Sequence, residues 1–172
     1  INELERSINR LSPTQRFAIV LFSNRPNPGG QGAALADFFP PGGESLAPAT
    51  PRAKSDAIAW ARAAEPRGLS NPADGLRRAL GLKPSVIFLL ARSIQRSGGA
   101  GEAQWGGGKD AILADLDRAN PIDPRTGRRA VAIKAVQFLE ADPTGIMPAI
   151  GHAHGGGDSG YTVLTRDMLG TR

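Results

Sequence analysis

The sequence predicts an α/β fold, a Rossmann-like three-layer sandwich in which a mostly parallel central sheet is flanked by helices. Helical segments with a 3.6-residue apolar period alternate along the chain with short apolar runs. The runs at 16–23 and 85–91 are apolar almost throughout rather than at every second residue, which is typical of parallel strands covered on both faces. Right-handed crossovers between such strands place helices on both faces of the sheet.

The length of 172 residues fits one domain, 1–172, and the sequence contains no internal repeat. There is no cysteine, which excludes disulfides and thiolate zinc sites but leaves the compartment open. No apolar run approaches the ~18 residues of a membrane span. The first residue is Ile1 rather than Met and no signal peptide is visible, so we expect a piece of a longer protein.

The net charge of +5 comes mainly from scattered arginines, with one cluster at Arg125, Arg128 and Arg129. That cluster surrounds Thr126-Gly127, which is typical of a solvated turn. A nucleic-acid surface needs a basic face with aromatic side chains among the charges. Aromatic residues make up only 5% of the chain and do not alternate with the arginines, so nucleic acid is not expected as a partner.

The first helix has apolar positions spaced i, i+4 and i+7, at Leu4, Ile8 and Leu11. Pro13 ends this helix. The run 16–23 is predicted to be a buried strand, and a loop rich in proline and glycine follows at 24–32. Segment 33–39 fits either a short edge strand or a helical turn, and both interpretations stay open.

The next segments read as a loop at 40–51 and a helix at 55–64. A further helix follows, with Ser70 or Asn71 as its N-cap and Pro72 at its first position, where proline is favoured. This helix buries Leu76, Ala79 and Leu80.

The carboxyl-terminal half continues the alternation. After Gly81 closes the helix, we expect a strand at 85–91, a loop at 94–108, a helix at 109–119 and a strand at 130–139. The last helix begins at Pro143 with Asp142 as its cap, and Gly155-Gly-Gly157 breaks it. A final strand is expected at 161–164.

Several of these segments, in this order, resemble a von Willebrand factor type A (VWA) domain. They are 16–23, 46–50, 57–60, 68–80, 86–93 and 130–138, with the ending from His154 to Val163. The resemblance covers almost the whole chain and implies the VWA fold. It also implies that the family's first strand and its Asp-x-Ser-x-Ser metal loop would precede Ile1. That strand is central in the family, so its absence leaves a gap between the strands at 16–23 and 85–91.

The resemblance also implies a degenerate metal site. The family's threonine ligand falls on Ser70, which keeps a hydroxyl, and its aspartate falls on Arg92. Arginine offers no oxygen to a hard cation, and its positive charge reverses an attraction of about 4 kcal/mol per unit-charge pair at ~4 Å. No cofactor is therefore expected, and Mg²⁺ or Mn²⁺ would bind only if the missing upstream loop supplied a working site.

The function that follows is a non-enzymatic protein-interaction module, with a protein partner that the sequence does not identify. The resemblance and the general position of ligands in open α/β sheets place the binding face beyond the strand ends. That face would carry Asn24, Ser70, Asn71, Arg92 and Ser93. Without a metal ion, Arg92 is a candidate to meet a carboxylate of the partner.

Two alternatives stay open. One is a serine hydrolase using Ser159 with His152 or His154, since the sequence around Ser159 is similar to the nucleophile segment of hydrolases. An esterase elbow needs a strand before the serine and a helix after it, whereas this sequence predicts the reverse order. The other alternative is an inert structural fragment completed by upstream sequence. The two histidines at a helix end are more simply explained by the helix dipole than by a metal site.

Overall fold

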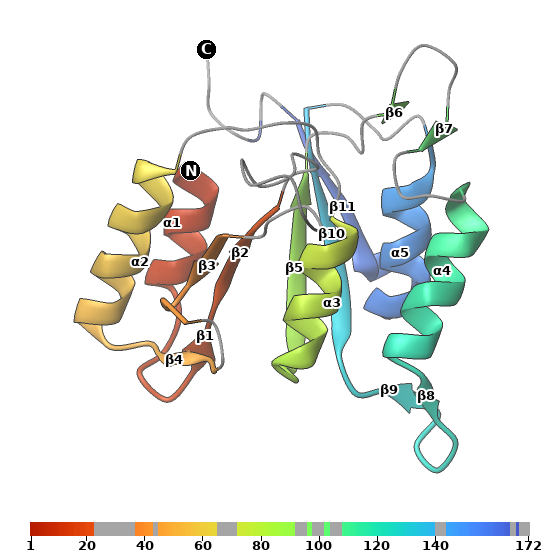
Figure 1. Cartoon of the computed structure of the whole chain (residues 1–172), viewed down its shortest axis with the longest axis horizontal. Helices are drawn as coiled ribbons and strands as arrows, with labels where there is room; N and C mark the ends of the chain where they lie inside the picture. Colours follow the sequence, from red (N-terminus) through yellow and green to blue (C-terminus); the bar gives the residue numbers. More distant parts are fainter. Residues whose placement is uncertain are drawn as a thin grey trace.

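The computed structural model describes residues 1–22, 37–42, 45–64, 72–91, 96–97, 102–103, 108–139, 144–165 and 168. Within these residues the fold is mixed α/β, as the sequence predicted. Figure 1 shows helices α1 (Asn2–Asn9) and α2 (Pro51–Ala63) at one side of the molecule and α3 (Ala73–Gly81), α4 (Gly108–Ala119) and α5 (Ile146–Gly155) at the other, with the three-stranded parallel sheet between the two groups.

The helices are α1 (Asn2–Asn9), α2 (Pro51–Ala63), α3 (Ala73–Gly81), α4 (Gly108–Ala119), α5 (Ile146–Gly155) and the 3-10 helix η1 (Gly157–Gly160). The strands are β1 (Arg16–Phe17), β2 (Ile19–Leu21), β3 (Asp37–Phe39), β4 (Ala47–Pro48), β5 (Val86–Ala91), β6 (Arg96–Ser97), β7 (Glu102–Ala103), β8 (Ile122–Asp123), β9 (Arg128–Arg129), β10 (Ala132–Phe138) and β11 (Tyr161–Leu164).

A three-stranded parallel sheet forms the carboxyl-terminal half, in the order β11-β10-β5. Its register pairs Ala132 with Val86 at one end of β5 and Gln137 with Ala91 at the other. Helices α4 and α5 pack together, and α5 lies against β10. The predicted strands at 85–91, 130–139 and 161–164 and the predicted helix at 109–119 are confirmed, with ends that differ by at most two residues. These elements could be predicted because each has a local apolar pattern.

The prediction of one parallel strand at 16–23 is wrong in two respects. The segment is divided at Ala18 into β1 and β2, and both pair in antiparallel fashion, β1 with β4 and β2 with β3. Continuous apolarity could not distinguish these pairings, because it reports burial on two faces and not the direction of the neighbour. Of the two interpretations of 33–39, the strand is confirmed for the described residues 37–39, which form β3.

Two helix starts differ from the prediction. Helix α2 begins at Pro51, inside the predicted loop, because the Thr50 hydroxyl accepts a hydrogen bond from Ala53 N at 3.2 Å and caps it. Helix α3 begins at Ala73, with Pro72 as its N-cap residue rather than its first residue. The predicted caps Ser70 and Asn71 lie outside the described residues, as do Asp142 and Pro143 before α5.

Two predicted loops contain short strand pairs. The segment 94–108 includes β6 and β7, which pair in antiparallel fashion, and α4 starts at its last residue. The arginine cluster lies on a β8–β9 hairpin whose register pairs Ile122 with Arg129. Isolated two-residue ladders carry too little apolar pattern to be recognised in the sequence.

Helices cover both faces of β2. Ile19 is buried in a cluster with Ile8 of α1 and Ala57 of α2. The next side chain, Val20, points the other way, and its Cγ1 would lie 3.5 Å from a Cβ placed on Gly75 of α3. Successive residues of one strand therefore face two different helical layers.

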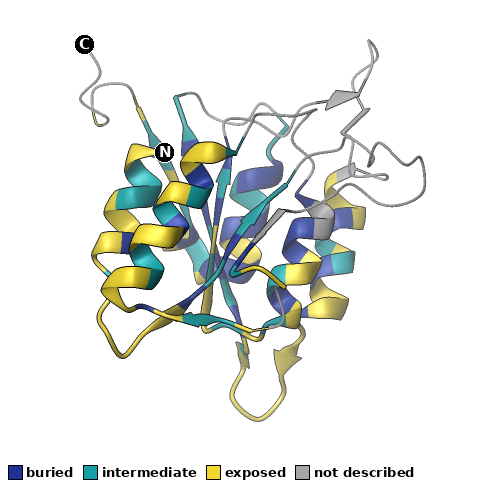
Figure 2. Ribbon diagram, turned by 60° about the vertical axis from the view of Figure 1, so that its left-hand side comes forward, coloured by how far each residue is buried: buried dark blue, intermediate teal, exposed yellow. Residues whose placement is uncertain are grey.

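The described core has two parts, which Figure 2 shows as buried stretches within the helices and strands. The first cluster joins α1 and α2 to β1, β2 and β3, and Trp60 of α2 packs against it beside Phe39. The second joins α3, α4 and α5 to β5 and β10. None of the described helices is long and apolar enough to cross a membrane.

Candidate functional site

The parallel sheet has one buried face and one more open face, on which β5 and β10 carry half-buried and exposed side chains. Along β5 the side chains of Leu89 and Ala91 are buried against α3, α4 and α5, with 3% and 7% exposure. The alternate residues Val86 and Phe88 are 39% and 60% exposed. Strand β10 repeats the alternation, with Ile133, Ala135 and Gln137 buried and their neighbours half-buried. A strand that carries apolar side chains on both faces is thus buried on one of them and only partly covered on the other.

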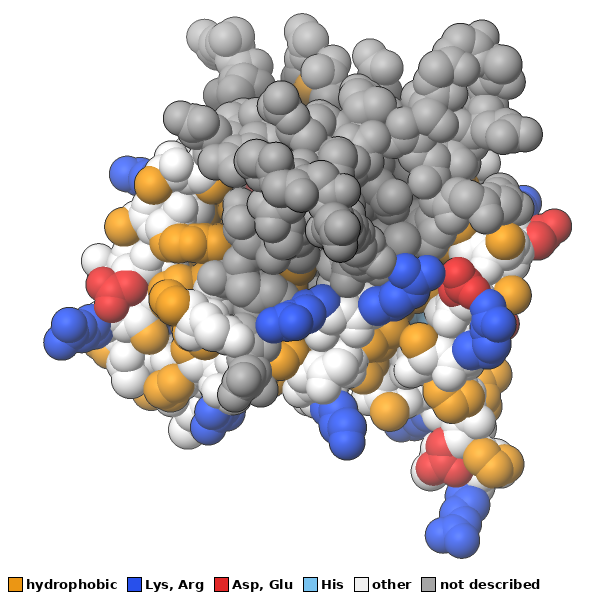
Figure 3. Space-filling model, viewed as in Figure 1, with side chains coloured by type: hydrophobic (Ala, Val, Ile, Leu, Met, Phe, Trp, Pro, Cys, Tyr) orange, Lys and Arg blue, Asp and Glu red, His pale blue; other side chains and the backbone are white. Residues whose placement is uncertain are grey.

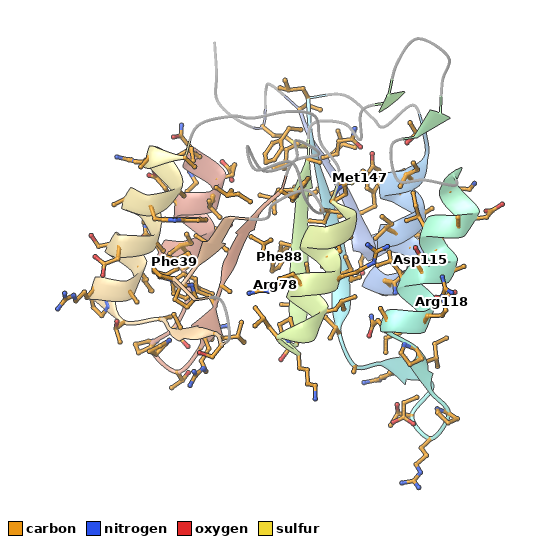
Figure 4. All side chains as sticks on the ribbon, in the orientation of Figure 1. Phe39, Arg78, Phe88, Asp115, Arg118 and Met147 are labelled. Atoms are coloured by element: carbon orange, nitrogen blue, oxygen red, sulfur yellow. The ribbon has the colours of Figure 1, made fainter. Side chains whose placement is uncertain are left out.

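On the open face, Phe88 lies opposite Lys134 in the register of β5 and β10. The Lys134 ammonium donates hydrogen bonds to the backbone oxygen of Ser159 at 3.2 Å and to its Oγ at 3.3 Å. Its charge is therefore held toward η1. Figure 4 shows Phe88 in the space between β5 and the strand β2.

The five predicted binding-face residues, Asn24, Ser70, Asn71, Arg92 and Ser93, all lie outside the described residues. What the structure describes is the set of elements that flank them. Figure 1 shows the end of β2, the start of α3 and the end of β5 at the same end of the molecule. In the sequence, Asn24 follows β2, Asn71 precedes α3 and Arg92 follows β5 directly.

The residues assigned to a metal site by the resemblance do not fit a divalent cation. Of the two, only Ser70 has an oxygen ligand, and Arg92 contributes a positive charge. Among the residues that the structure describes, no group of three or more His, Asp or Glu side chains is arranged to hold a metal ion. We therefore assign no chemistry to a metal in this chain.

Ser159 lies in η1, directly before β11. Its Oγ donates to the backbone oxygen of Gly156 at 3.3 Å and accepts from Lys134. The two histidines have other neighbours: His152 Nε2 lies 3.9 Å from Asp158 Oδ1, and His154 faces Asp117. The order is helix, 3-10 turn and strand, so the strand-to-helix elbow of a hydrolase is not what surrounds Ser159.

A polar cluster joins the last turn of α5 to α4 and β9, with His154 buried and the Asp117 side chain 54% exposed. The side chain of His154 is fully buried, and its Nε2 lies 3.3 Å from Asp117 Oδ1 without the alignment of a hydrogen bond. Arg129 Nη2 lies 2.6 Å from the same carboxylate oxygen. Burial, followed by the charge of Arg129, lowers the pKa of His154 to about 4, and Asp117 opposes this shift. His154 is accordingly neutral at pH 7.

Arg129 also connects this cluster to its surroundings. Its Nε donates to Ala153 O at 3.1 Å and its Nη1 to Asn120 O at 2.5 Å, so one guanidinium joins α5 to the end of α4. The predicted turn arginine is therefore a structural residue, with only 14% of its side chain exposed. No spacing in the sequence marks its partners, which come from separate elements.

The surface charge agrees with the scattered pattern of the sequence. In the view of Figure 3, the lysine and arginine side chains of the described residues are spread over the surface, with acidic side chains among them. Several are paired, such as Arg77 with Asp115 at 3.3 Å and Arg62 with Glu5 at 2.5 Å. Exposed pairs of this kind stabilise a fold little.

Comparison of the sequence with protein-family models gives no match, and comparison with curated proteins finds no relative. The resemblance to VWA domains therefore remains a prediction from the ordered segments of the sequence.

Proposed function

We propose that this chain is a non-enzymatic protein-interaction module with a VWA-like, three-layer Rossmann-like fold and a degenerate metal site. The observation that supports it most is the position of the end of β2, the start of α3 and the end of β5 at one end of the molecule. Ligands of open α/β sheets bind beyond the carboxyl ends of the strands. The sequence that adjoins these three ends contains Asn24, Asn71 and Arg92.

The chemistry of the five residues points to an acidic partner. Two asparagines, two serines and one arginine supply hydrogen-bond donors and a positive charge, and none of them is a carboxylate. A guanidinium binds a carboxylate with two parallel hydrogen bonds. In the family that this chain resembles, a divalent cation would bind such a carboxylate by coordination. Arg92 would thus take over the electrostatic role of the ion.

A displayed library of random peptides, selected on the immobilised protein, tests this proposal. We expect enrichment of peptides with Asp or Glu, lost in Arg92→Glu and retained in Arg125→Glu. Arg125 is a matched control because it is an exposed arginine on the β8–β9 hairpin. Selection of the same peptides by both variants would contradict the assignment of Arg92.

Metal independence and lack of catalysis are tested separately. We expect Mg²⁺ and Mn²⁺, compared with chelator, to leave the unfolding midpoint of the full-length protein unchanged. A site filled at 100 times its dissociation constant would add about 2.7 kcal/mol to the free energy of unfolding. We also expect no turnover of generic ester substrates. Turnover that Ser159→Ala abolishes would establish the hydrolase instead.

A further inference from the structure

We propose that His154 is a pH-sensitive switch: when its imidazole takes up a proton, Arg129 leaves Asp117 and the β8–β9 hairpin separates from the end of α5. Three observations support this inference. Arg129 joins the hairpin to α5, the imidazole of His154 is buried without hydrogen bonds, and one carboxylate oxygen of Asp117 lies close to both residues. The switch is independent of the ligand face proposed above.

Arg129 connects the β8–β9 hairpin to the rest of the molecule. Residues 121–128 are all exposed, and Figure 1 shows the hairpin projecting beyond the helices. The guanidinium of Arg129 donates to Ala153 O of α5 at 3.1 Å and to Asn120 O, at the end of α4, at 2.5 Å. Only 14% of this side chain is exposed. Release of the guanidinium would therefore remove the hydrogen bond between the hairpin and α5.

The site of His154 suits a neutral imidazole and not a charged one. The side chain is fully buried, and neither ring nitrogen has a hydrogen-bond partner among the described residues. Its Nε2 lies 3.3 Å from Asp117 Oδ1, the same oxygen that Arg129 Nη2 approaches at 2.6 Å. A protonated imidazole donates from both nitrogens. After protonation, the imidazolium and the guanidinium would thus compete for one carboxylate oxygen.

The balance of charge decides which group leaves. Arg129 and Asp117 are the charged groups that act on His154, and their charges cancel while the imidazole is neutral. A proton on His154 sets two cations against one carboxylate in a site that excludes water from the ring. Arg129 belongs to the projecting hairpin, and its partner Asp117 is 54% exposed, so the guanidinium can reach water. His154 is part of a packed helix, and we therefore assign the movement to Arg129.

The other titratable groups on the elements packed against α5 interact elsewhere. On β10, η1 and β11 these groups are Lys134, Asp158 and Tyr161, whose partners are Ser159, His152 and Gln137 in that order. On α4, Lys109 and Asp110 lie in the first turn, and Asp115 and Arg118 pair with each other. The competition for Asp117 is accordingly confined to His154 and Arg129.

The separation has a defined pH window. Burial, followed by the charge of Arg129, lowers the pKa of His154 to about 4, whereas a hydrated imidazole has a pKa of about 6.5. The open form, in which water reaches the ring, therefore binds more protons between these values. Its population should rise as the pH falls from 6.5 toward 4, by at most about 60-fold between pH 7 and 4.5.

Amide hydrogen exchange at pH 7 and 4.5, corrected for the intrinsic effect of pH, tests the switch. We expect amides of β9 and of the last turn of α5 to lose protection by about tenfold or more at pH 4.5. This exchange should depend little on added urea, because a local opening exposes little surface. Unchanged protection would overturn the proposal. Loss of protection with the urea dependence of the β10 amides would also overturn it, by showing that the whole domain unfolds instead.

Two variants assign the effect to His154. His154→Gln should abolish the additional exchange at pH 4.5, because the group that takes up the proton is gone. His152→Gln is the matched control in the same helix, where the side chain of His152 is 72% exposed, and it should retain the additional exchange. Equal pH dependence in the two variants would contradict the role of His154.

A second pair of variants tests the attachment of Arg129 at pH 7, without any titration. Asp117→Asn removes the carboxylate that holds the guanidinium, so exchange in β9 should accelerate by about tenfold at neutral pH. Asp115→Asn is the control, because Asp115 lies on the same helix and pairs with the exposed Arg118 instead. Similar exchange of β9 in both variants would show that Asp117 does not hold the hairpin.

Discussion

Phe88 and Leu89 are consecutive residues of β5 with opposite surroundings: Phe88 is 60% exposed, and Leu89 is 3% exposed within the cluster of α3, α4 and α5. Both are apolar, so their types do not indicate which of them is covered. The difference arises from the alternation of side chains along a strand, together with the packing of α3, α4 and α5 against the face that carries Leu89.

This relationship predicts different costs of truncation in residues 1–172. Leu89→Ala should reduce the free energy of unfolding by about 2–5 kcal/mol, because it leaves a cavity in the core. Phe88→Ala should cost less than about 1 kcal/mol, because water already surrounds most of this side chain. Urea unfolding of both variants measures the difference, and similar losses would contradict the observed exposure.

His154 should make stability depend on pH. Its pKa is about 4 in the folded state and about 6.5 in the unfolded chain, so between these values the unfolded state binds more protons. The stabilisation is present above pH 6.5 and is lost as the pH falls toward 4. We expect a loss of about 1–3 kcal/mol across this range, measured by urea unfolding at pH 7, 5.5 and 4.5.

Two variants separate this effect from other acidic titrations. His154→Gln should flatten the decline between pH 6.5 and 4.5, because the titrating group is gone. His152→Gln should retain it, since the side chain of His152 is 72% exposed in the same helix. An unchanged pH profile for His154→Gln would show that other groups cause the decline.

Asn120 should be a strong determinant of stability at the junction of α4 and β10. Its Nδ2 donates to Val131 O at 2.7 Å, and its Oδ1 accepts from Val131 N at 3.2 Å, with the residue only 2% exposed. Asn120→Ala leaves both backbone groups without this partner and should cost about 2–3 kcal/mol. Asn120→Asp loses only the donor and brings a carboxylate charge into a buried site. Chemical unfolding should therefore show a reduced free energy of unfolding for this variant, and the reduction should increase above the pKa of the new carboxyl group.

The contact between α5 and η1 depends on two glycines. A Cβ at Gly160 would lie 1.8 Å from Gly151 O, which is backbone and cannot move aside without shifting the helix. Gly160→Ala should cost about 3 kcal/mol or more in thermal unfolding. Gly81→Ala in α3 is the control, because nothing lies within 4 Å of a Cβ placed on Gly81. This substitution should be neutral or should stabilise the fold by up to about 1 kcal/mol. Equal midpoints for the two variants would contradict the close packing.

The candidate ligand face was named from the sequence through the VWA resemblance, and the structure describes only the elements beside it. Strands β2 and β5 belong to separate sheets, and the gap that the resemblance implies between 16–23 and 85–91 stays a prediction. The polar cluster of His154, Asp117 and Arg129 had no signal in the sequence. Local spacing cannot identify residues that three different elements bring together.

The sequence by itself determined the α/β alternation, including β5, α4, β10 and β11, because apolar periodicity is a local property of the chain. Only the tertiary structure decided that 16–23 divides between two antiparallel partners and that Phe88 stays exposed while Leu89 is buried. These outcomes depend on which strand or helix lies beside a residue in space. That neighbour is set by packing between distant segments, and a continuous apolar run is compatible with several such neighbours.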